Sequence, residues 1–345
     1  MKHVPPPVVL LLASLVFACT EDPVAPRETD GAAVGIVVSS VDRALTIFDV
    51  EAPEQSFSIG LAPDGSPVTL AVRGTLVAVP LGTVPALAVA DLETRAVVRT
   101  VPLPEGSGAT GVAFLNDSIA IVANPSLNTV TPVNVLRGTR GEDLQVGAYP
   151  QSVVAVPDTV FVLNATLGPD FNPAGPATVS VITGTPTSVV RTITLSGLNA
   201  GAGVATSDGR LIVVNAGSFG AANGSISIVS RSTLMESQHV TGFGDFPGAV
   251  AIGPNGQIHV ASFSYGVAIW DPSTSAFVRA PDQAIQPGGV ASASGLGFDE
   301  DGRLYTLMPE CREPSRALRL TATFTVDVEI PTGICPFGIA FVRLP

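Results

Sequence analysis

Short stretches that alternate apolar and small residues recur along the chain, each after a turn that contains Pro or Gly. They are SPVTLAV (66–72), ATGVAF (109–114), PQSVVAV (150–156), GAGVAT (201–206), PGAVAI (247–252), ASGLGF (293–298) and PFGIAF (336–341). Their small central residues are Ala71, Ala113, Ala155, Ala205, Ala251, Gly297 and Ala340, with successive spacings of 42, 42, 50, 46, 46 and 43 residues. Alternation with period two is typical of β-strands, so the chain predicts seven repeats that each begin with a strand.

A tight turn follows each small residue closely, as at Asp208-Gly209 and Asn255-Gly256. Asn-Gly and Asp-Gly supply the positive φ that two-residue hairpins need, so a second strand should follow each turn. Third and fourth apolar stretches complete a four-stranded antiparallel meander of about 40–50 residues. Because such a sheet cannot bury both faces alone, the prediction is an all-β, seven-bladed β-propeller. The alternative is chance spacing in a chain rich in Ala and Gly.

The two ends of this pattern complement each other. Residues 33–60 offer three apolar stretches without a first strand, and FGIAFVRL (337–344) offers a first strand with no repeat after it. We expect the C-terminal strand to pair with the N-terminal blade, which closes the ring without a free sheet edge.

Composition and charge narrow the classes of partner. Hydrophobic residues make up 46% of the chain and charged residues 13%, which is ample material for a core. The net charge is −12 and Lys2 is the only lysine, so no basic patch is available for nucleic acid, and anionic membrane surfaces would repel the protein. The expected partner is a small ligand or an envelope protein, and the expected state is a monomer.

The first residues predict export. Lys2 precedes an apolar stretch that is too short to span a bilayer and ends in VFAC at Cys19, which is similar to a bacterial lipobox. We expect a signal peptide over 1–18, a flexible tether over 19–31 and the propeller over 32–345. A covalent lipid on Cys19 is the only expected cofactor and membrane contact. For a Gram-negative bacterium, Thr20 after Cys19 favours the outer membrane, because no Asp that retains lipoproteins in the inner membrane follows the lipid site. The alternative is an ordinary signal peptide.

Several strand ends carry a family resemblance. Second strands end in IVAN (121–124), FVLN (161–164) and IVVN (212–215), and third strands end in LAVADLET and VAIWDPST. This pattern resembles the YVTN-type β-propeller repeat family over residues 32–345. The resemblance implies the same seven-bladed ring.

The two remaining cysteines are Cys311 and Cys335. In an exported chain they are expected to form a disulfide, with two buried thiols as the alternative. Cys311 follows the second strand of its repeat and Cys335 the fourth. Loops after second and fourth strands lie on one face of a propeller, so the two residues should be neighbours.

The same face should hold the candidate binding residues, because loops on a rigid scaffold commonly carry binding function. The longest insertion, ATLGPDFNPAGPAT (165–178), lies there. The candidates are Asn124, Asn164, Asp170, Asn215, Asp245 and Glu310. The alternative is that the Asn side chains only satisfy backbone groups where strands end.

A catalytic constellation is not evident. His239 and His259 fall in different strands, and no spacing typical of a zinc site or of a nucleophile elbow occurs. A calcium site in DEDGR (299–303) lacks downstream ligands. One Trp and three Tyr argue against an aromatic-lined platform for a quinone or a sugar. The expected function is non-catalytic binding with no metal and no catalytic residue; the alternative is a metal-dependent lactonase or lyase at the channel mouth.

Overall fold

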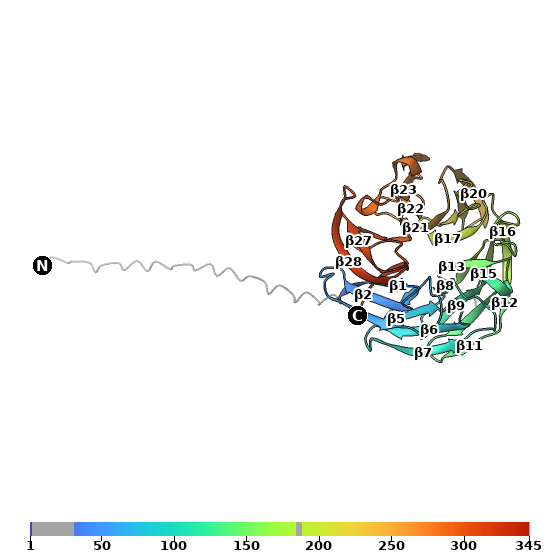
Figure 1. Ribbon diagram of the computed structural model, residues 1–345, viewed down its shortest axis with the longest axis horizontal. Helices are drawn as coiled ribbons and strands as arrows, with labels where there is room; N and C mark the ends of the chain where they lie inside the picture. The colour runs from blue at the N-terminus through green and yellow to red at the C-terminus, as the bar shows by residue number, and fades with distance from the viewer. Residues whose placement is uncertain (2–30, 184–187, 345) are drawn as a thin grey trace.

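Seven antiparallel sheets form the molecule, as predicted. The computed structural model describes Met1 and residues 31–183 and 188–344, so Cys19 and the predicted signal segment lie outside the described residues. The described part contains 29 strands and three short 3-10 helices, η1 (Pro125–Leu127), η2 (Pro281–Gln283) and η3 (Pro287–Gly289). The sheets are arranged as blades around an axis (Figure 1). Across these ranges, no helix is long and apolar enough to cross a membrane.

Each blade contains four strand positions, from the axis outward, and blade 1 is the blade that holds the N-terminal strand. The innermost strands of blades 1 to 7 are β29 (Pro336–Arg343), β4 (Ala71–Arg73), β8 (Val112–Phe114), β13 (Pro150–Val156), β17 (Ala200–Ala205), β21 (Pro247–Ile252) and β25 (Gly295–Phe298). The second strands are β1 (Ala33–Ser39), β5 (Leu76–Pro80), β9 (Ile119–Asn124), β14 (Thr159–Asn164), β18 (Arg210–Asn215), β22 (Ile258–Ser262) and β26 (Leu304–Leu307).

The third strands are β2 (Ala44–Asp49), β6 (Ala86–Asp91), β10 (Thr129–Asn134), β15 (Thr178–Thr183), β19 (Ser225–Ser230), β23 (Gly266–Asp271) and β27 (Pro314–Leu320). The outermost strands are β3 (Ser56–Gly60), β7 (Ala96–Pro102), β16 (Val189–Thr194), β20 (Met235–Thr241), β24 (Ala276–Arg279) and β28 (Val326–Ile334). In blade 3 the outermost position is divided between β11 (Thr139–Arg140) and β12 (Leu144–Gln145), which both pair with β10. The seven small residues that define the repeat all lie in innermost strands, so the predicted period is confirmed.

The core lies between blades. Seven clusters of buried apolar side chains each join two neighbouring blades, as between β5 of blade 2 and β9 of blade 3. Second strands such as β9 are buried almost throughout, whereas outermost strands such as β7 are mostly exposed. Each blade therefore buries both faces against its neighbours, and burial of this apolar area drives closure of the ring.

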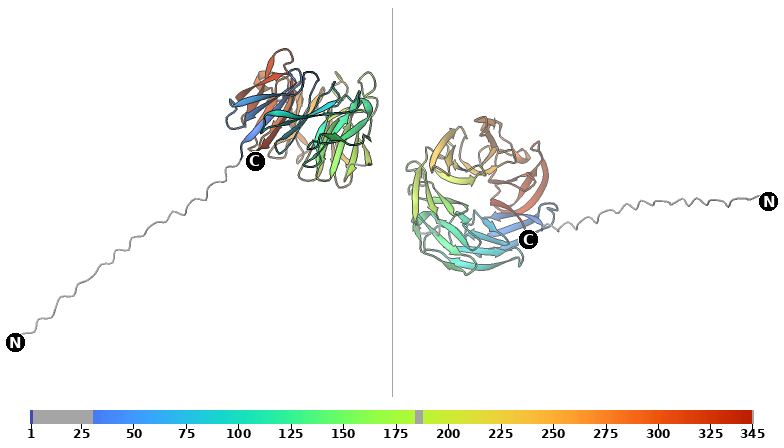
Figure 2. Two further views of the ribbon diagram at one scale, coloured as in Figure 1. Left: turned by 90° about the horizontal axis from the view of Figure 1, so that it is seen from below. Right: turned by 180° about the vertical axis from the view of Figure 1, so that it is seen from behind.

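The C-terminal strand closes the ring in the predicted way. β29 pairs antiparallel with β1, with Val34 opposite Val342 and Ile36 opposite Ala340. Figures 1 and 2 show this blade, which contains both ends of the described propeller, beside blade 7. At that seam the ring of Tyr305 packs 4.8 Å from the ring of Phe341, centroid to centroid, in one apolar cluster. The pairing removes the edges that an open ring would expose.

Candidate functional site

A central channel runs between the innermost strands and forms a cavity of about 570 Å³. All seven blades contribute to its wall, from Val68–Leu70 beside β4 to Phe337–Ile339 in β29. No residue that the structure places in this wall has a charged side chain; the wall consists mainly of small and apolar residues, neutral polar groups and four aromatic rings. The volume is typical of sites for small molecules.

Glycine allows the innermost strands to approach one another closely. A Cβ atom at Gly111 would lie 2.7 Å from the carbonyl oxygen of Gln151, and one at Gly295 would lie 2.4 Å from that of Phe337. Both distances are too short for a side chain, so these two positions require glycine. Gly248, by contrast, has no heavy atom within 4 Å of its ideal Cβ position, and it faces the open channel.

Hydroxyl groups connect neighbouring blades at the channel wall. Thr110 Oγ1 donates to the carbonyl oxygen of Gln151 at 3.1 Å, and Ser294 Oγ donates to that of Pro336 at 2.6 Å. Thr69 Oγ1 makes the same kind of bond to the carbonyl oxygen of Thr110. These hydroxyls therefore form hydrogen bonds across the blade interfaces. The bonds hold neighbouring innermost strands in place at the channel wall.

Two faces of the ring differ in their loops. The mouth face is formed by the loops after second and fourth strands, and the hairpin face by the turns after first and third strands. Hydrogen bonds join the two loop types on the mouth face: Ala165 N donates to Tyr149 O at 2.9 Å, and Cys335 N to Glu310 O at 2.6 Å. Cys311 and Cys335 form a disulfide on this face, as predicted, with Cα atoms 4.2 Å apart.

Aromatic rings surround the channel on the mouth face. We call Tyr149, Phe246, Phe263 and Phe337, which line the cavity, together with Phe171 and Phe219, the aromatic mouth. The six rings form three pairs, Tyr149–Phe171, Phe219–Phe246 and Phe263–Phe337, with centroids 5.8–6.0 Å apart. Phe219 is 81% exposed and Phe171 is 67% exposed. Large apolar rings that remain in water around a cavity commonly mark a binding surface.

Backbone conformation places two of these rings. Tyr149 and Phe246 each directly precede the proline that begins an innermost strand, and their φ angles are +54° and +47°. Bulky residues rarely adopt this left-handed region, and such strain persists only where the surrounding structure enforces it. Burial raises the pKa of the Tyr149 hydroxyl above its ordinary value of 10, at which the group is already neutral at physiological pH.

The three predicted asparagines lie at the mouth-face ends of second strands, but their side chains are fully buried. Asn164 Nδ2 donates to Thr178 Oγ1 and Ser180 Oγ, both at 3.0 Å. Asn124 and Asn215 make equivalent pairs of bonds to hydroxyls of the third strand. In these positions the amides tie second strands to third strands, and they do not line the cavity.

The three predicted carboxylates lie in mouth-face loops. Asp170, beside Phe171, accepts a 2.9 Å hydrogen bond from Asn172 Nδ2, and this bond lowers the pKa of the Asp170 carboxyl. Asp245, beside Phe246, accepts from the backbone N–H of Gly220 at 2.8 Å and from Ser264 Oγ at 3.3 Å. Glu310 is exposed beside the disulfide. The structure thus places Asp170 and Asp245 next to the aromatic mouth.

The composition did not reveal the aromatic mouth. The low numbers of Trp and Tyr argue only against a platform for a quinone or a sugar, whereas three of the four rings that line the cavity are phenylalanines. The available signals were the 15 Phe residues and the Tyr-Pro and Phe-Pro pairs at the starts of two innermost strands.

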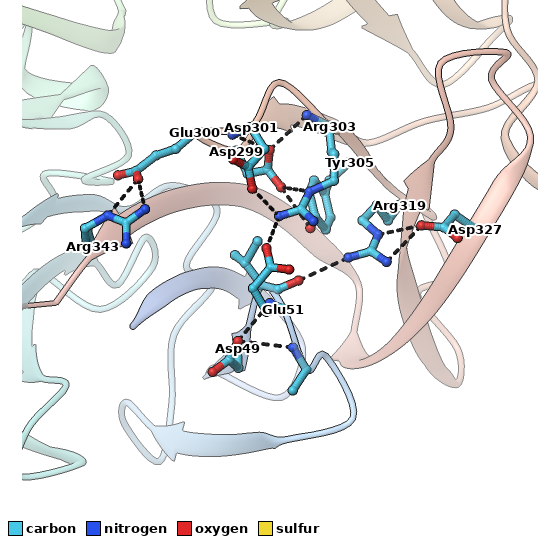
Figure 3. A network of polar contacts seen from close by, with 12 residues as sticks. Asp49, Glu51, Asp299, Glu300, Asp301, Arg303, Tyr305, Arg319, Asp327 and Arg343 are labelled. Atoms are coloured by element: carbon cyan, nitrogen blue, oxygen red, sulfur yellow. Dashed lines mark hydrogen bonds and ion pairs between the residues drawn. The ribbon is translucent and has the colours of Figure 1, made fainter. Parts of the chain in front are cut away.

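The acidic turn at 299–303 forms ion pairs on the hairpin face. Arg303 contacts the carboxylates of Asp299, Asp301 and Glu51, and Arg343 contacts Glu300 (Figure 3). Over the described ranges, no group of three or more His, Cys, Asp or Glu side chains is arranged to hold a metal ion. His259 is buried against the ring of Phe298 in the interface between blades 6 and 7.

Comparison with known proteins identifies the fold alone. No protein-family model and no curated protein sequence matches the chain. Three similar solved structures are a functionally unknown protein from Desulfotomaculum acetoxidans DSM 771, the Kuenenia stuttgartiensis hydrazine synthase and the WD40 β-propeller domain of Doa1. The first has a TM-score of 0.67 at 15% identity and covers 90% of this chain and 99% of that chain. The second has a TM-score of 0.66 at 14% identity, with coverages of 82% and 97%. The third has a TM-score of 0.61 at 14% identity, with coverages of 80% and 90%. The chain is a seven-bladed β-propeller.

Proposed function

We propose that this propeller is a non-catalytic ligand-binding protein of the bacterial cell envelope, and that its ligand binds at the aromatic mouth. One observation carries the proposal: a cavity of about 570 Å³, with no charged side chain among the described residues of its wall, opens where exposed aromatic rings gather. Cavities with apolar walls and a few neutral polar groups are typical of ligand sites.

The envelope location is supported by the first residues of the sequence. The apolar stretch before Cys19 is similar to a lipoprotein signal. We also propose that the chain is a YVTN-type repeat protein, because the end of the IVVN strand is similar to that repeat. We propose a lipid anchor on Cys19 and attachment to the outer membrane. Labelling of cells with an alkyne fatty acid should modify the full-length protein and should not modify the Cys19→Ser variant. Equal labelling of both proteins would contradict the anchor.

The binding site can be tested by filling the channel. A side chain at Gly248 meets no neighbouring atom at its Cβ, so Gly248→Trp should occupy the cavity without disturbing the fold. Gly60, in outermost strand β3, has equally open surroundings and gives a matched control, Gly60→Trp. Ligand-observed NMR with a library of small cationic, neutral and anionic aromatic fragments should detect binding to wild type and Gly60→Trp. Binding that persists in Gly248→Trp would overturn this site.

A further inference from the structure

The two faces of the ring differ in how their carboxylates are neutralised. Mouth-face loops contain eight carboxylates and two arginines, Arg43 and Arg312; the carboxylates are Asp42, Asp64, Glu105, Asp170, Asp245, Asp282, Glu310 and Glu313. None of these eight carboxylates forms an ion pair with an arginine among the described residues. On the hairpin face, by contrast, Arg73, Arg210 and Arg303 each pair with nearby carboxylates. The mouth-face loops therefore carry a net negative formal charge that no ion pair among the described residues offsets.

The wall of the cavity is chemically complementary to an organic cation. Aromatic faces carry a negative quadrupole that attracts an organic cation over the ring, and four such rings line the cavity. No arginine lies in the described wall to occupy them or to attract an anion. The nearest predicted carboxylates, Asp170 and Asp245, adjoin aromatic residues of the mouth and lie outside the wall. They can attract a cation from solution without having to be desolvated themselves.

From these two observations we infer that the ligand of the aromatic mouth is an organic cation, a positively charged nitrogen on an apolar body. This inference rests on the proposed binding function. The apolar body fills the channel, and the cationic group lies against the aromatic rings. A small inorganic cation would need several oxygen ligands, and anions are repelled by the carboxylates of the mouth face.

Three probes that share a phenyl ring separate the charge classes. Benzyltrimethylammonium is the cation, benzyl alcohol the neutral probe and benzenesulfonate the anion. Calorimetric titration at low ionic strength should give a cation affinity about tenfold or more above that of benzyl alcohol, with the weakest binding for benzenesulfonate. Gly248→Trp should abolish cation binding and Gly60→Trp should not.

Two sets of variants locate the source of the preference. Phe246→Leu and Phe263→Leu should each weaken cation binding by about threefold to thirtyfold and benzyl alcohol binding by less. The triple variant Asp170→Asn, Asp245→Asn, Glu310→Gln should weaken cation binding several-fold at low salt, with the difference shrinking as salt screens the charges. Its matched control neutralises three exposed hairpin-face carboxylates, Glu54→Gln, Glu93→Gln and Asp158→Asn, and should bind like wild type.

The outcomes distinguish this inference from the proposed function. If benzyl alcohol or benzenesulfonate binds as tightly as the cation and Gly248→Trp removes that binding, the site stands and the cation inference is overturned. If the cation binds equally to wild type and Gly248→Trp, both are overturned. If none of the three probes binds, the cation inference is overturned, and the fragment library decides the proposed function. If the cation binds more tightly than the other two probes, and Gly248→Trp and the phenylalanine substitutions remove this binding, the result supports both the cation inference and the proposed function.

Discussion

The backbone N–H of Ile334 donates a hydrogen bond to Oδ2 of Asp42, 2.7 Å away, although 292 positions separate the two residues in the chain. Next to it, Ser40 N donates to the carbonyl oxygen of Cys335 at 2.9 Å, and the disulfide attaches Cys335 to blade 7. On the hairpin face, Arg303 of blade 7 pairs with Glu51 of blade 1. The seam of the ring is therefore held on both faces.

Removal of the closing strand should abolish cooperative folding. A chain that ends at Ile334 lacks β29 and half of the disulfide, so the edge of β1 and the apolar seam around Phe48 are exposed. Thermal unfolding followed by circular dichroism should lose its single sharp transition. A chain that ends at Arg343 is the control. A truncated protein that melts like full-length protein would show that β29 is dispensable for closure.

The disulfide should stabilise the folded protein, because the bond restricts the conformations of the unfolded chain. Cys311 and Cys335 are 24 residues apart, and the chain-entropy model gives about 3–4 kcal/mol for such a loop. Urea unfolding of the Cys311→Ser, Cys335→Ser double variant should show a free energy of unfolding lower by up to this amount. Adding a reductant to wild type should have the same effect, and the reductant should leave the double variant unchanged. Equal stability with and without the bond would contradict this prediction.

The ion pair between Arg303 and Asp299 should contribute more than the pair between Arg303 and Glu51. The Asp299 side chain is 2% exposed and contacts Arg303 Nε at 2.7 Å, whereas the Glu51 side chain is 68% exposed. Arg303→Ala leaves a buried carboxylate without its cation and should lower the free energy of unfolding by about 2–3 kcal/mol. Glu51→Gln should cost clearly less, because solvent and salt screen exposed pairs. If urea unfolding shows that Arg303→Ala and Glu51→Gln lower the free energy of unfolding equally, this order is wrong.

Burial of His259 predicts acid sensitivity. In the folded protein, burial lowers the pKa of its imidazole from 6.5 to about 4, and the contact with Gln257 O offsets only part of this shift. Between these pH values the unfolded chain binds a proton that the folded chain does not, so stability is fully present above pH 6.5 and decreases as the pH falls. The loss should reach about 3 kcal/mol near pH 4.

Urea unfolding at a series of pH values measures this effect. His259→Gln should remove most of the slope between pH 6.5 and 4, and His239→Gln, at an exposed site, should retain it. A slope that is unchanged in His259→Gln would assign the acid sensitivity to other groups.

The buried asparagines should affect stability and leave ligand binding unchanged. Asn164→Ala removes two hydrogen bonds and leaves the Thr178 and Ser180 hydroxyls without this partner, which should cost about 1–3 kcal/mol. Fragment binding measured by NMR on the folded variant should equal that of wild type. Loss of binding without loss of stability would instead make Asn164 a ligand contact.

Much of the fold could be predicted because it depends on local patterns. Alternation defines strands such as β13, and Asp-Gly turns fix hairpins such as the one before Arg210. The closing role of β29 and the disulfide then follow from the repeat count, because loops after second and fourth strands must lie on one face. Each of these inferences needs only the order of strands within a blade.

The candidate site could be predicted only in part. The sequence by itself determined that Asn164 and Asp170 belong to one face, because Asn164 ends a second strand and Asp170 lies in the loop that follows it. It could not determine which side chains meet at the axis, since that depends on how seven separate strands converge. Only the tertiary structure decided that Asn164 is buried inside its own blade, where neighbouring strands supply hydroxyl partners. It also decided that Tyr149 and Phe246, held at positive φ by the packed ring, surround the channel together with Phe263 and Phe337.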